Sequence, residues 1–217
     1  MKKQFVLLFA ASCLIISACT NSGSKTEAGN NADSTKTSEV KKEPLKGKYG
    51  LKSAIIEMKS MVMGLEQKQI LMFDEYGAKE CTEVTANLFG QKSHNINITK
   101  EGFIYSIDMV KKTGTKMKVP ADLAVNFNDL GGALVKEMNI KKVGSETFFG
   151  KQCDKYTIDF KKQQMKGYYL VWNGIPLKTE ITVMGMKTLV EVVKITENAT
   201  IDASKFEVPK GIKIENF

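Results

Sequence analysis

Apolar and polar residues alternate along most of the chain between Tyr49 and Thr196. Two stretches, 103–109 and 154–160, show this most clearly, because apolar side chains fall on every second residue with polar ones between them. Period-two alternation is typical of β-strands with one buried face. Glycine-containing pairs such as Asn173-Gly174 and Met184-Gly185 interrupt the pattern and predict tight turns. We therefore predict a long antiparallel sheet or barrel, with three consecutive antiparallel strands over residues 166–196.

One segment, Pro120 to Asn139, departs from this alternation. Its proline suits the first turn of a helix, and Gly131-Gly132 is expected to bend or divide that helix. Its apolar residues recur every three or four positions, which is the spacing of one helix face: Leu123, Phe127, Leu130, Leu134 and Met138. A single amphipathic helix in such a chain has to place this stripe on the sheet. The predicted fold is mainly β (α+β), a curved antiparallel sheet or incomplete β-barrel with a helical segment covering its concave face.

The N-terminus carries a hydrophobic pattern of another kind. Two lysines precede an apolar run from Phe5 to Ala18, which as a helix spans about 21 Å and is too short for a hydrocarbon core of roughly 30 Å. This arrangement is typical of a secretory signal peptide. The sequence Ile16-Ser17-Ala18-Cys19 resembles the bacterial lipobox, which implies cleavage before Cys19 and lipidation of its thiol. We predict a signal peptide over residues 1–18 and a membrane anchor at Cys19.

The residues after Cys19 predict a tether and then a folded domain. Residues 19–43 are rich in Ser, Thr, Asn, Lys and Glu and contain no aromatic residue, so they cannot bury enough apolar surface to offset their chain entropy. The domain is expected to span residues 44–217, enough for one real core. Thr20 rather than Asp follows the cysteine, and no acidic run comes after it. By the sorting patterns of bacterial lipoproteins, this favours the outer membrane, facing the periplasm.

The charge of the chain limits the kinds of partner that it is expected to bind. The formal net charge is +8, and every basic residue is a lysine. The chain has no arginine, whose guanidinium group makes paired hydrogen bonds to phosphates and to base edges. Its lysines are scattered among acidic residues rather than clustered. We therefore expect no nucleic-acid partner. A solvated lysine-rich surface is the main interpretation, with weak attraction to anionic lipid headgroups as the alternative.

Two cysteines lie within the predicted domain, Cys81 and Cys153. Both have charged neighbours in the sequence, and an envelope compartment is oxidising. We predict that the two form a disulfide. The alternative is two free, partly exposed thiols.

The sequence offers little for catalysis. Its one histidine, His94, lies in the polar stretch GQKSHN, and the chain has no nucleophile motif, phosphate-binding glycine loop or zinc-binding motif. The methionines of residues 58–63 alternate between two faces of a strand, so they cannot close one metal site. We predict a protein that is not an enzyme and that needs no cofactor or metal.

The apolar faces of the predicted strands and helix supply a candidate ligand site. Methionine and aromatic side chains suit a plastic apolar cavity, although they serve equally well in a filled core. Both interpretations stay open at this point. The candidate lining residues are Met58, Tyr105, Ile107, Met109, Phe127, Leu130, Leu134, Tyr156, Ile158 and Trp172.

The stretch NATIDASKFEVPKGIKI, residues 198–214, resembles the C-terminus of the LolA/LolB-like lipoprotein-localisation family, with its turn, Phe, Pro-containing step and last strand. DEYGAKE (74–80), VGSETFFGKQCDKYTI (143–158) and VWNGIPLKTEI (171–181) are similar to strand–turn–strand units of small envelope lipoproteins in that superfamily. The resemblance covers residues 48–217 and implies an incomplete barrel whose concave apolar face is covered by helices. In carrier members that cavity receives lipoprotein acyl chains, and another relative is a periplasmic stress-sensing domain.

Two functions follow from the residues and the resemblance together. The first is non-catalytic binding of an apolar or acylated ligand by a membrane-anchored envelope lipoprotein. The second is an envelope interaction or stress-sensor domain with a filled core, whose partner would be another envelope protein.

Overall fold

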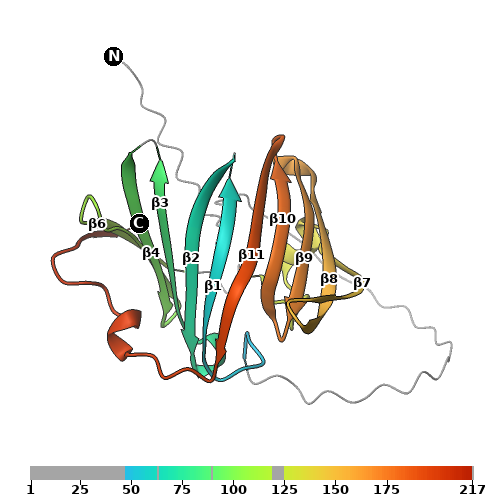
Figure 1. Cartoon of the computed structure of the whole chain (residues 1–217), viewed down its shortest axis with the longest axis horizontal. Helices are drawn as coiled ribbons and strands as arrows, with labels where there is room; N and C mark the ends of the chain where they lie inside the picture. The colour runs from blue at the N-terminus through green and yellow to red at the C-terminus, as the bar shows by residue number, and fades with distance from the viewer. Residues whose placement is uncertain (1–46, 63, 89, 119–124, 217) are drawn as a thin grey trace, which may run out of the picture. The chain divides into compact units, whose positions relative to one another are not determined.

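The alternating stretches form the strands of one sheet (Figure 1). The structure is a computed structural model and describes residues 47–62, 64–88, 90–118 and 125–216. The predicted signal peptide, the predicted lipidation site at Cys19 and the predicted tether lie outside these residues. The contacts of the chain define a unit from Leu45 to Phe217 that contains the sheet.

The described residues contain twelve strands in the order β12-β6-β5-β4-β3-β2-β1-β11-β10-β9-β8-β7. All neighbouring strands are antiparallel except β12, which runs parallel to β6. Since β12 and β7 are both edge strands, the sheet is not closed into a barrel. The bounds are β1 Ala54–Val62, β2 Leu65–Asp74, β3 Lys79–Leu88, β4 Gln91–Lys100, β5 Phe103–Asp108, β6 Thr113–Lys118, β7 Lys141–Phe148, β8 Lys151–Phe160, β9 Met165–Trp172, β10 Ile175–Val183, β11 Met186–Glu197 and β12 Lys213–Asn216.

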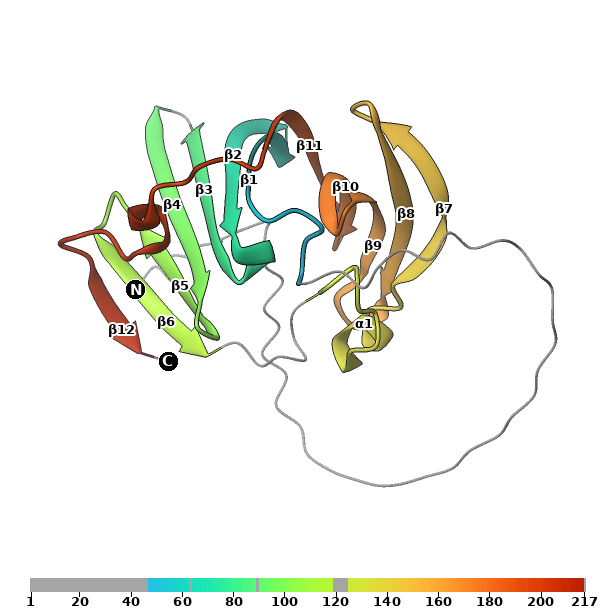
Figure 2. The same cartoon turned by 90° about the horizontal axis from the view of Figure 1, so that it is seen from below.

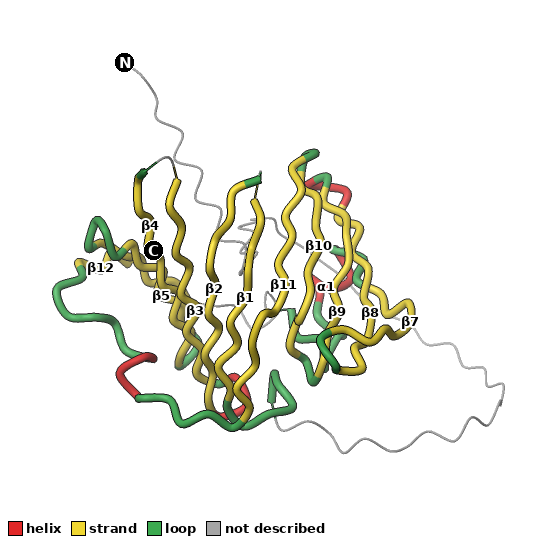
Figure 3. Tube along the Cα trace, in the orientation of Figure 1, coloured by secondary structure: helices red, strands yellow, loops and turns green. Residues whose placement is uncertain are grey.

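The strand predictions are confirmed where the alternation is clearest. Residues 103–108 and 154–160 fall in β5 and β8, with Met109 just after β5, and residues 166–196 lie in the three consecutive antiparallel strands β9, β10 and β11 and their turns. The predicted turns at Asn173-Gly174 and Met184-Gly185 connect these last strands. We call the end of the sheet that holds the β9–β10 turn the lower end and the opposite end, with the β10–β11 turn, the upper end (Figure 3).

Alternation gives the sheet two distinct faces. In the central strands, Ile56 is paired with Leu71 on one face, and Met72 is paired with Cys81 on the other. We call the face that holds Ile56 the inner face. The strand pairing continues this face from β1 through Val190 on β11 and Thr179 on β10 to Tyr169 on β9. The ring of Tyr169 packs against Phe127, in the segment before β7. Figure 2 shows that the sheet is curved and that the short helix α1, Ala133–Glu137, lies on its concave side. The inner face is therefore the concave one.

The predicted helix over residues 120–139 is largely wrong. Residues 120–124 lie outside the described part of the chain, and within the remainder only α1 is helical. The side chains of Asn126 and Asp129 accept hydrogen bonds from the backbone amides of Asn128 and Gly131, so turns replace the helix before α1. The helix begins only after Gly132, which is extended at φ −62° and ψ 151°. The short helix and the loop before it reach β8 and β9 and do not form a continuous cover.

The outer face of β2 to β5 is covered by the C-terminal segment, residues 198–212. This segment holds a 3₁₀ turn, η4 (Ala203–Phe206), which begins where the Asp202 side chain accepts a hydrogen bond from the amide of Ser204. Its buried Phe206 packs in a cluster with side chains of β2, β3, β4 and β5: Met72, Cys81, Ile96, Ile98 and Ile107. The turn, phenylalanine and last strand expected from the family resemblance are all present. The turn and the phenylalanine cover the face opposite α1, while the last strand β12 extends the sheet beside β6.

No helix within the described residues is long and apolar enough to cross a membrane.

Candidate functional site

The lower half of the inner face is apolar. Ala54 and Ile56 of β1 lie opposite Phe73 and Leu71 of β2, and all four are buried. On the neighbouring strand β11, Val192 lies opposite Met58 and is 4% exposed. These side chains form one cluster that continues into β9 and β10. The central strands therefore carry an apolar surface on the concave side of the sheet.

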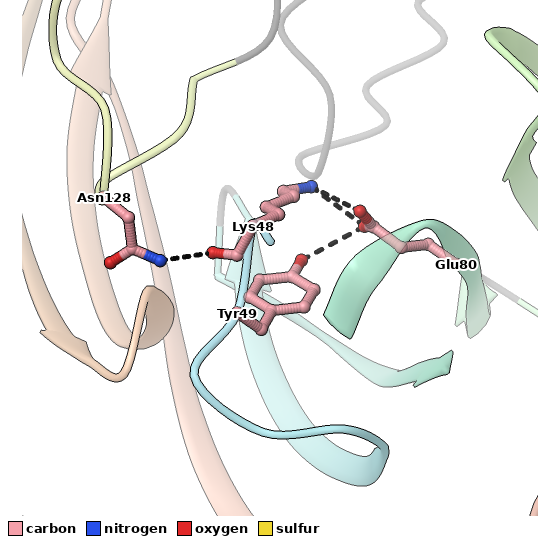
Figure 4. Close-up of polar contacts among 4 residues, drawn as sticks. All are labelled: Lys48, Tyr49, Glu80 and Asn128. Atoms are coloured by element: carbon pink, nitrogen blue, oxygen red, sulfur yellow. Dashed lines mark hydrogen bonds and ion pairs between the residues drawn. The ribbon is translucent and has the colours of Figure 1, made fainter. Parts of the chain in front are cut away.

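A polar cluster closes the lower end of this surface (Figure 4). The Lys48 Nζ atom lies 2.7 and 2.9 Å from the two carboxylate oxygens of Glu80, and the Tyr49 hydroxyl donates to the same carboxylate at 3.1 Å. The ring of Tyr49 packs on Phe73. The polar groups of the cluster thus satisfy one another, while its aromatic ring joins the apolar surface.

The same cluster connects three parts of the chain. The backbone oxygen of Lys48 accepts a hydrogen bond of 2.7 Å from the Asn128 side chain, in the loop before α1. The amide of Gly50 donates to the oxygen of Asn173 at 2.8 Å, in the β9–β10 turn. A Cβ atom at Gly174 would lie 2.5 Å from the Lys48 oxygen, so this contact requires glycine. The start of the domain is therefore fastened to the loop that reaches β8 and β9.

Two groups of the cluster, Lys48 and Tyr49, have pKa values above their ordinary values. Burial raises the pKa of Tyr49 above its ordinary value, and the Glu80 carboxylate raises it further. Burial alone would lower the pKa of Lys48, but Tyr49 and Glu80 outweigh it and hold the pKa above its ordinary value. General bases work best with a pKa near the working pH, and both shifts lead away from neutral pH.

Polar side chains border this apolar region on the inner face. Thr82 and Asn97 pair on β3 and β4, and Gln69 lies opposite Met58; all three are buried. Ser60, nearer the upper end of β1, is only 1% exposed, and its hydroxyl has no hydrogen-bond partner among the described residues. A buried hydroxyl without a partner is destabilising and calls for an explanation such as a bound ligand or water. The apolar cluster of the inner face is thus bordered by polar side chains, on β3 and β4 at the level of Leu71 and at Gln69 and Ser60 farther up β2 and β1.

Some of the predicted cavity residues do meet on the inner face. Phe127 packs on Tyr156, with ring centroids 5.0 Å apart, and on Tyr169 at 5.1 Å. Leu134 of α1 is buried and Leu130 is partly buried. Ile158 lies two residues beyond Tyr156 on β8 and is also buried. Met58 shares this face farther along the sheet, on β1.

The other predicted cavity residues lie elsewhere, so the ten do not line one cavity. Tyr105, Ile107 and Met109 belong to the outer cluster with Phe206 and pack under the C-terminal segment. Trp172 is at the edge of the central cluster, and the Lys151 Nζ atom lies 4.3 Å from its ring centroid. The alternation placed Tyr105 and Ile107 on one face of β5 correctly, although Ile104 on the other face is buried as well. It could not show that the face with Tyr105 and Ile107 packs against the C-terminal segment.

The predicted disulfide is wrong. Cys81 and Cys153 are both free, and they lie in different apolar clusters, on β3 and β8. Neither thiol is partly exposed, since the side chains are 1% and 0% exposed. Their charged neighbours in the sequence point away because successive residues of a strand face opposite sides. Burial raises the pKa of Cys81 to about 12 and also raises that of Cys153.

The remaining candidates for chemistry are few. Within the described residues no group of three or more His, Cys, Asp or Glu side chains is arranged to hold a metal ion. His94 lies on β4 with its Nε2 atom 4.0 Å from the Glu83 carboxylate, too far for a hydrogen bond. A cavity of about 450 Å³ lies beside η4 on the outer side, but its lining includes the ion pairs Lys79–Glu75 and Lys100–Glu207. Such a lining does not suit an apolar ligand.

Sequence reasoning missed the polar residues of the inner face and the cluster at its lower end. Ser60, Gln69 and Thr82 stand at positions of the alternation where an apolar residue is expected for burial. That exception was visible in the sequence. The Lys48–Tyr49–Glu80 cluster had no such signal, because its members meet only through the pairing of distant segments.

Comparisons with known proteins place the fold without naming a family. No protein-family model matches the chain. No curated protein matches it by sequence. A solved structure of an uncharacterised conserved protein from Thermus thermophilus is similar, with a TM-score of 0.51 and 10% identity over 76% of this chain and 90% of that chain. This similarity is one of fold.

Two further structures are similar at lower scores. MucB in the Pseudomonas aeruginosa MucA/MucB complex has a TM-score of 0.49 and 11% identity, over 75% of this chain and 58% of that chain. A putative outer membrane lipoprotein-sorting protein domain from Vibrio parahaemolyticus has a TM-score of 0.38 and 8% identity, over 71% of this chain and 89% of that chain.

Proposed function

We propose that the chain is a membrane-anchored envelope lipoprotein whose domain binds one apolar or acylated ligand along its inner face, without catalysis. The observation that carries this proposal is an apolar cluster on that face bordered by buried polar side chains, among them Ser60, whose hydroxyl has no partner among the described residues. An acyl chain attached to a polar head has the same division. The closed lower end would receive the end of the acyl chain.

The binding mechanism is burial. Each methylene group that leaves water contributes about 0.8 kcal/mol, so a long chain lying along Ile56, Leu71 and Phe73 needs no covalent step. The polar head would sit near Ser60 and Gln69, where the Ser60 hydroxyl gains the partner it lacks. Release requires only a second apolar acceptor.

The envelope location rests on the sequence. The lipobox-like residues Ile16 to Cys19 support a lipid anchor, and Thr20 supports the outer membrane facing the periplasm. An anchored domain that handles acyl chains would then work beside the bilayer that contains them.

Two serines, Ser60 in β1 and Ser53 just before it, test the role of the polar lining. Ser60→Ala removes a hydroxyl that has no partner, so we expect unchanged or higher stability together with weaker binding of a fluorescent long-chain fatty acid. Ser53→Ala is the matched control, because the Ser53 hydroxyl donates to the backbone oxygen of Ala199 at 2.9 Å. It should cost about 1 kcal/mol of stability and leave fatty-acid binding unchanged.

The outcomes of this pair are distinct. Weaker binding in Ser60→Ala alone supports a ligand head at this position. If the parent protein takes up no fatty acid and Ser60→Ala only changes stability, the inner face is a filled core and the proposal is wrong.

A further inference from the structure

The hairpin turns at the two ends of the sheet differ in charge. Counted with two residues on either side, the five turns at the upper end hold seven lysines and three acidic residues, a net charge of +4. The four turns at the lower end, counted in the same way, hold three lysines and four acidic residues, a net charge of −1. The positive charge of the hairpins is thus concentrated at one end.

The lysines of the upper end are well exposed. The side chains of Lys161 and Lys162, between β8 and β9, are 84% and 74% exposed, and Lys111, between β5 and β6, is 65% exposed. Each of these three is near a carboxylate, but such exposed ion pairs contribute little stability. Their ammonium groups can therefore exchange a carboxylate for another anion at small cost.

The turn between β10 and β11 shows a second feature of this end. Met184 occupies a left-handed backbone conformation, with φ 49°, and is 67% exposed. Asn, Asp and Gly are the residues that suit such a position in a two-residue hairpin, and the β9–β10 turn at the lower end does use Asn173 there. Val110, in the β5–β6 turn, is likewise 61% exposed. These apolar side chains do nothing evident for the fold.

We propose that the upper turns, residues 110–112, 161–164 and 184–187, form a surface that docks on anionic phospholipid. The lysines would pair with headgroup phosphates, while Met184 and Val110 would enter the interfacial region. Basic residues combined with a few apolar ones favour adsorption on an anionic bilayer. This inference rests on the envelope location in the proposed function, and it adds an orientation, in which the polar part of the inner face opens toward the membrane.

The predicted anchor permits this orientation. Lys48 lies at the lower end, where its backbone oxygen is next to Gly174 of the β9–β10 turn, and it is 29 residues after Cys19 in the sequence. At roughly 3.3 Å per residue those residues can reach about 95 Å, whereas a strand of ten residues is only about 33 Å long. The chain length therefore allows the upper end to contact the bilayer that holds the anchor.

Vesicle binding by residues 20–217, which lack the acylated cysteine, tests the surface. We expect this chain to bind vesicles of phosphatidylglycerol in phosphatidylcholine and not vesicles of phosphatidylcholine alone, with affinity falling as salt rises. Each lysine near an anionic surface contributes about 1 kcal/mol, so the variant Lys161→Gln/Lys162→Gln should bind roughly 10- to 30-fold more weakly at low salt. Lys52→Gln/Lys79→Gln removes the same charge at the lower end and should change binding by less than about threefold.

A second pair of variants tests the apolar part. Met184→Asn replaces a strained exposed methionine with a residue that suits the turn, so it should weaken vesicle binding without lowering stability. Phe149→Asn makes the matching change in the lower β7–β8 turn, where φ is 50°, and should leave vesicle binding unchanged.

Equal losses from changes at the two ends, or equal binding to the two kinds of vesicle, would overturn the inference. The fatty-acid experiment is independent of it. If the parent protein binds anionic vesicles through the upper turns but takes up no fatty acid, the docking surface is supported and the proposed ligand site is wrong.

Discussion

The ring of Tyr49 lies against the ring of Phe73, with centroids 4.3 Å apart and planes inclined by 40°, at the lower end of the inner face. This contact joins the first residues of the domain to β2. The Tyr49 hydroxyl extends past the apolar surface to the Glu80 carboxylate on β3, 3.1 Å away. One side chain thus contributes to the apolar lining and to the cluster that closes it.

Tyr49→Phe should separate these two contributions. The ring contact stays, but the Glu80 carboxylate loses one buried donor, so we expect a loss of about 1–2 kcal/mol in the free energy of unfolding. Urea unfolding measures it. Tyr168→Phe is the control, since the Tyr168 hydroxyl is 3.5 Å from Glu180 in a less buried place, and should cost under about 0.5 kcal/mol. Equal costs for the two variants would show that the Tyr49–Glu80 bond has no special weight.

Both thiols should be unreactive in the folded protein. Burial raises the pKa of Cys81 to about 12, so almost none of it is thiolate at neutral pH, and Cys153 shifts in the same direction. We expect slow labelling by iodoacetamide in native buffer and labelling of both cysteines after unfolding without reductant. Absence of free thiols in the unfolded, unreduced domain would mean that the two are paired, contrary to the structure.

Gly167 should not tolerate a side chain. A Cβ atom there would lie 2.0 Å from the backbone oxygen of Glu180, on the paired strand β10. Gly144 has nearly the same φ, 156° against 159°, but open space around it. We expect Gly167→Ala to be more destabilising than Gly144→Ala by at least about 2 kcal/mol in thermal or urea unfolding. Similar losses would mean that backbone strain alone, rather than the contact with β10, requires glycine.

Cys19→Ala tests the anchor. Without its thiol the chain cannot be diacylglycerylated, so we expect loss of labelling by a fatty-acid probe in cells and retention of the signal peptide. A Cys13→Ala control, within the predicted signal peptide, should label normally. Persistent labelling of Cys19→Ala would contradict the anchor.

The sequence predicted the strands well and their packing poorly, for reasons visible in particular residues. Period-two alternation reports which side of a strand is buried, so the apolar side of β5 with Tyr105 and Ile107 was identified correctly. The alternation does not show which element covers that side. Here the covering residue is Phe206, which lies about a hundred residues farther along the chain.

The helix prediction failed because apolar spacing is only one of the forces on the backbone. Phe127 and Leu134 are buried as a helical stripe requires. Between them, Asn126 and Asp129 offer side-chain acceptors that favour turns, and two glycines follow at positions 131 and 132. The same burial is therefore reached with one short helix.

The candidate site was predicted only in part. Met58, Phe127, Leu134, Tyr156 and Ile158 do lie on the inner face, and Trp172 packs at the edge of the cluster that contains Met58. Tyr105, Ile107 and Met109 pack on the outer face. The polar lining around Ser60 escaped prediction because a buried serine in a strand is identified only when register shows which face it shares. The basic surface of the upper turns could not be predicted without the strand order, because that order decides which hairpins lie at the same end of the sheet.

The central claim, an apolar ligand on the inner face, is tested most directly by two neighbouring valines of β11. Val192 is 4% exposed on that face, whereas Val193, at a shift in the pairing with β1, is 53% exposed. We expect Val192→Trp to fill the apolar part and to abolish uptake of a fluorescent long-chain fatty acid, while Val193→Trp binds it like the parent. Circular dichroism of both variants should show an intact sheet. Uptake that is equal in the two folded variants, or absent from the parent, would contradict the account.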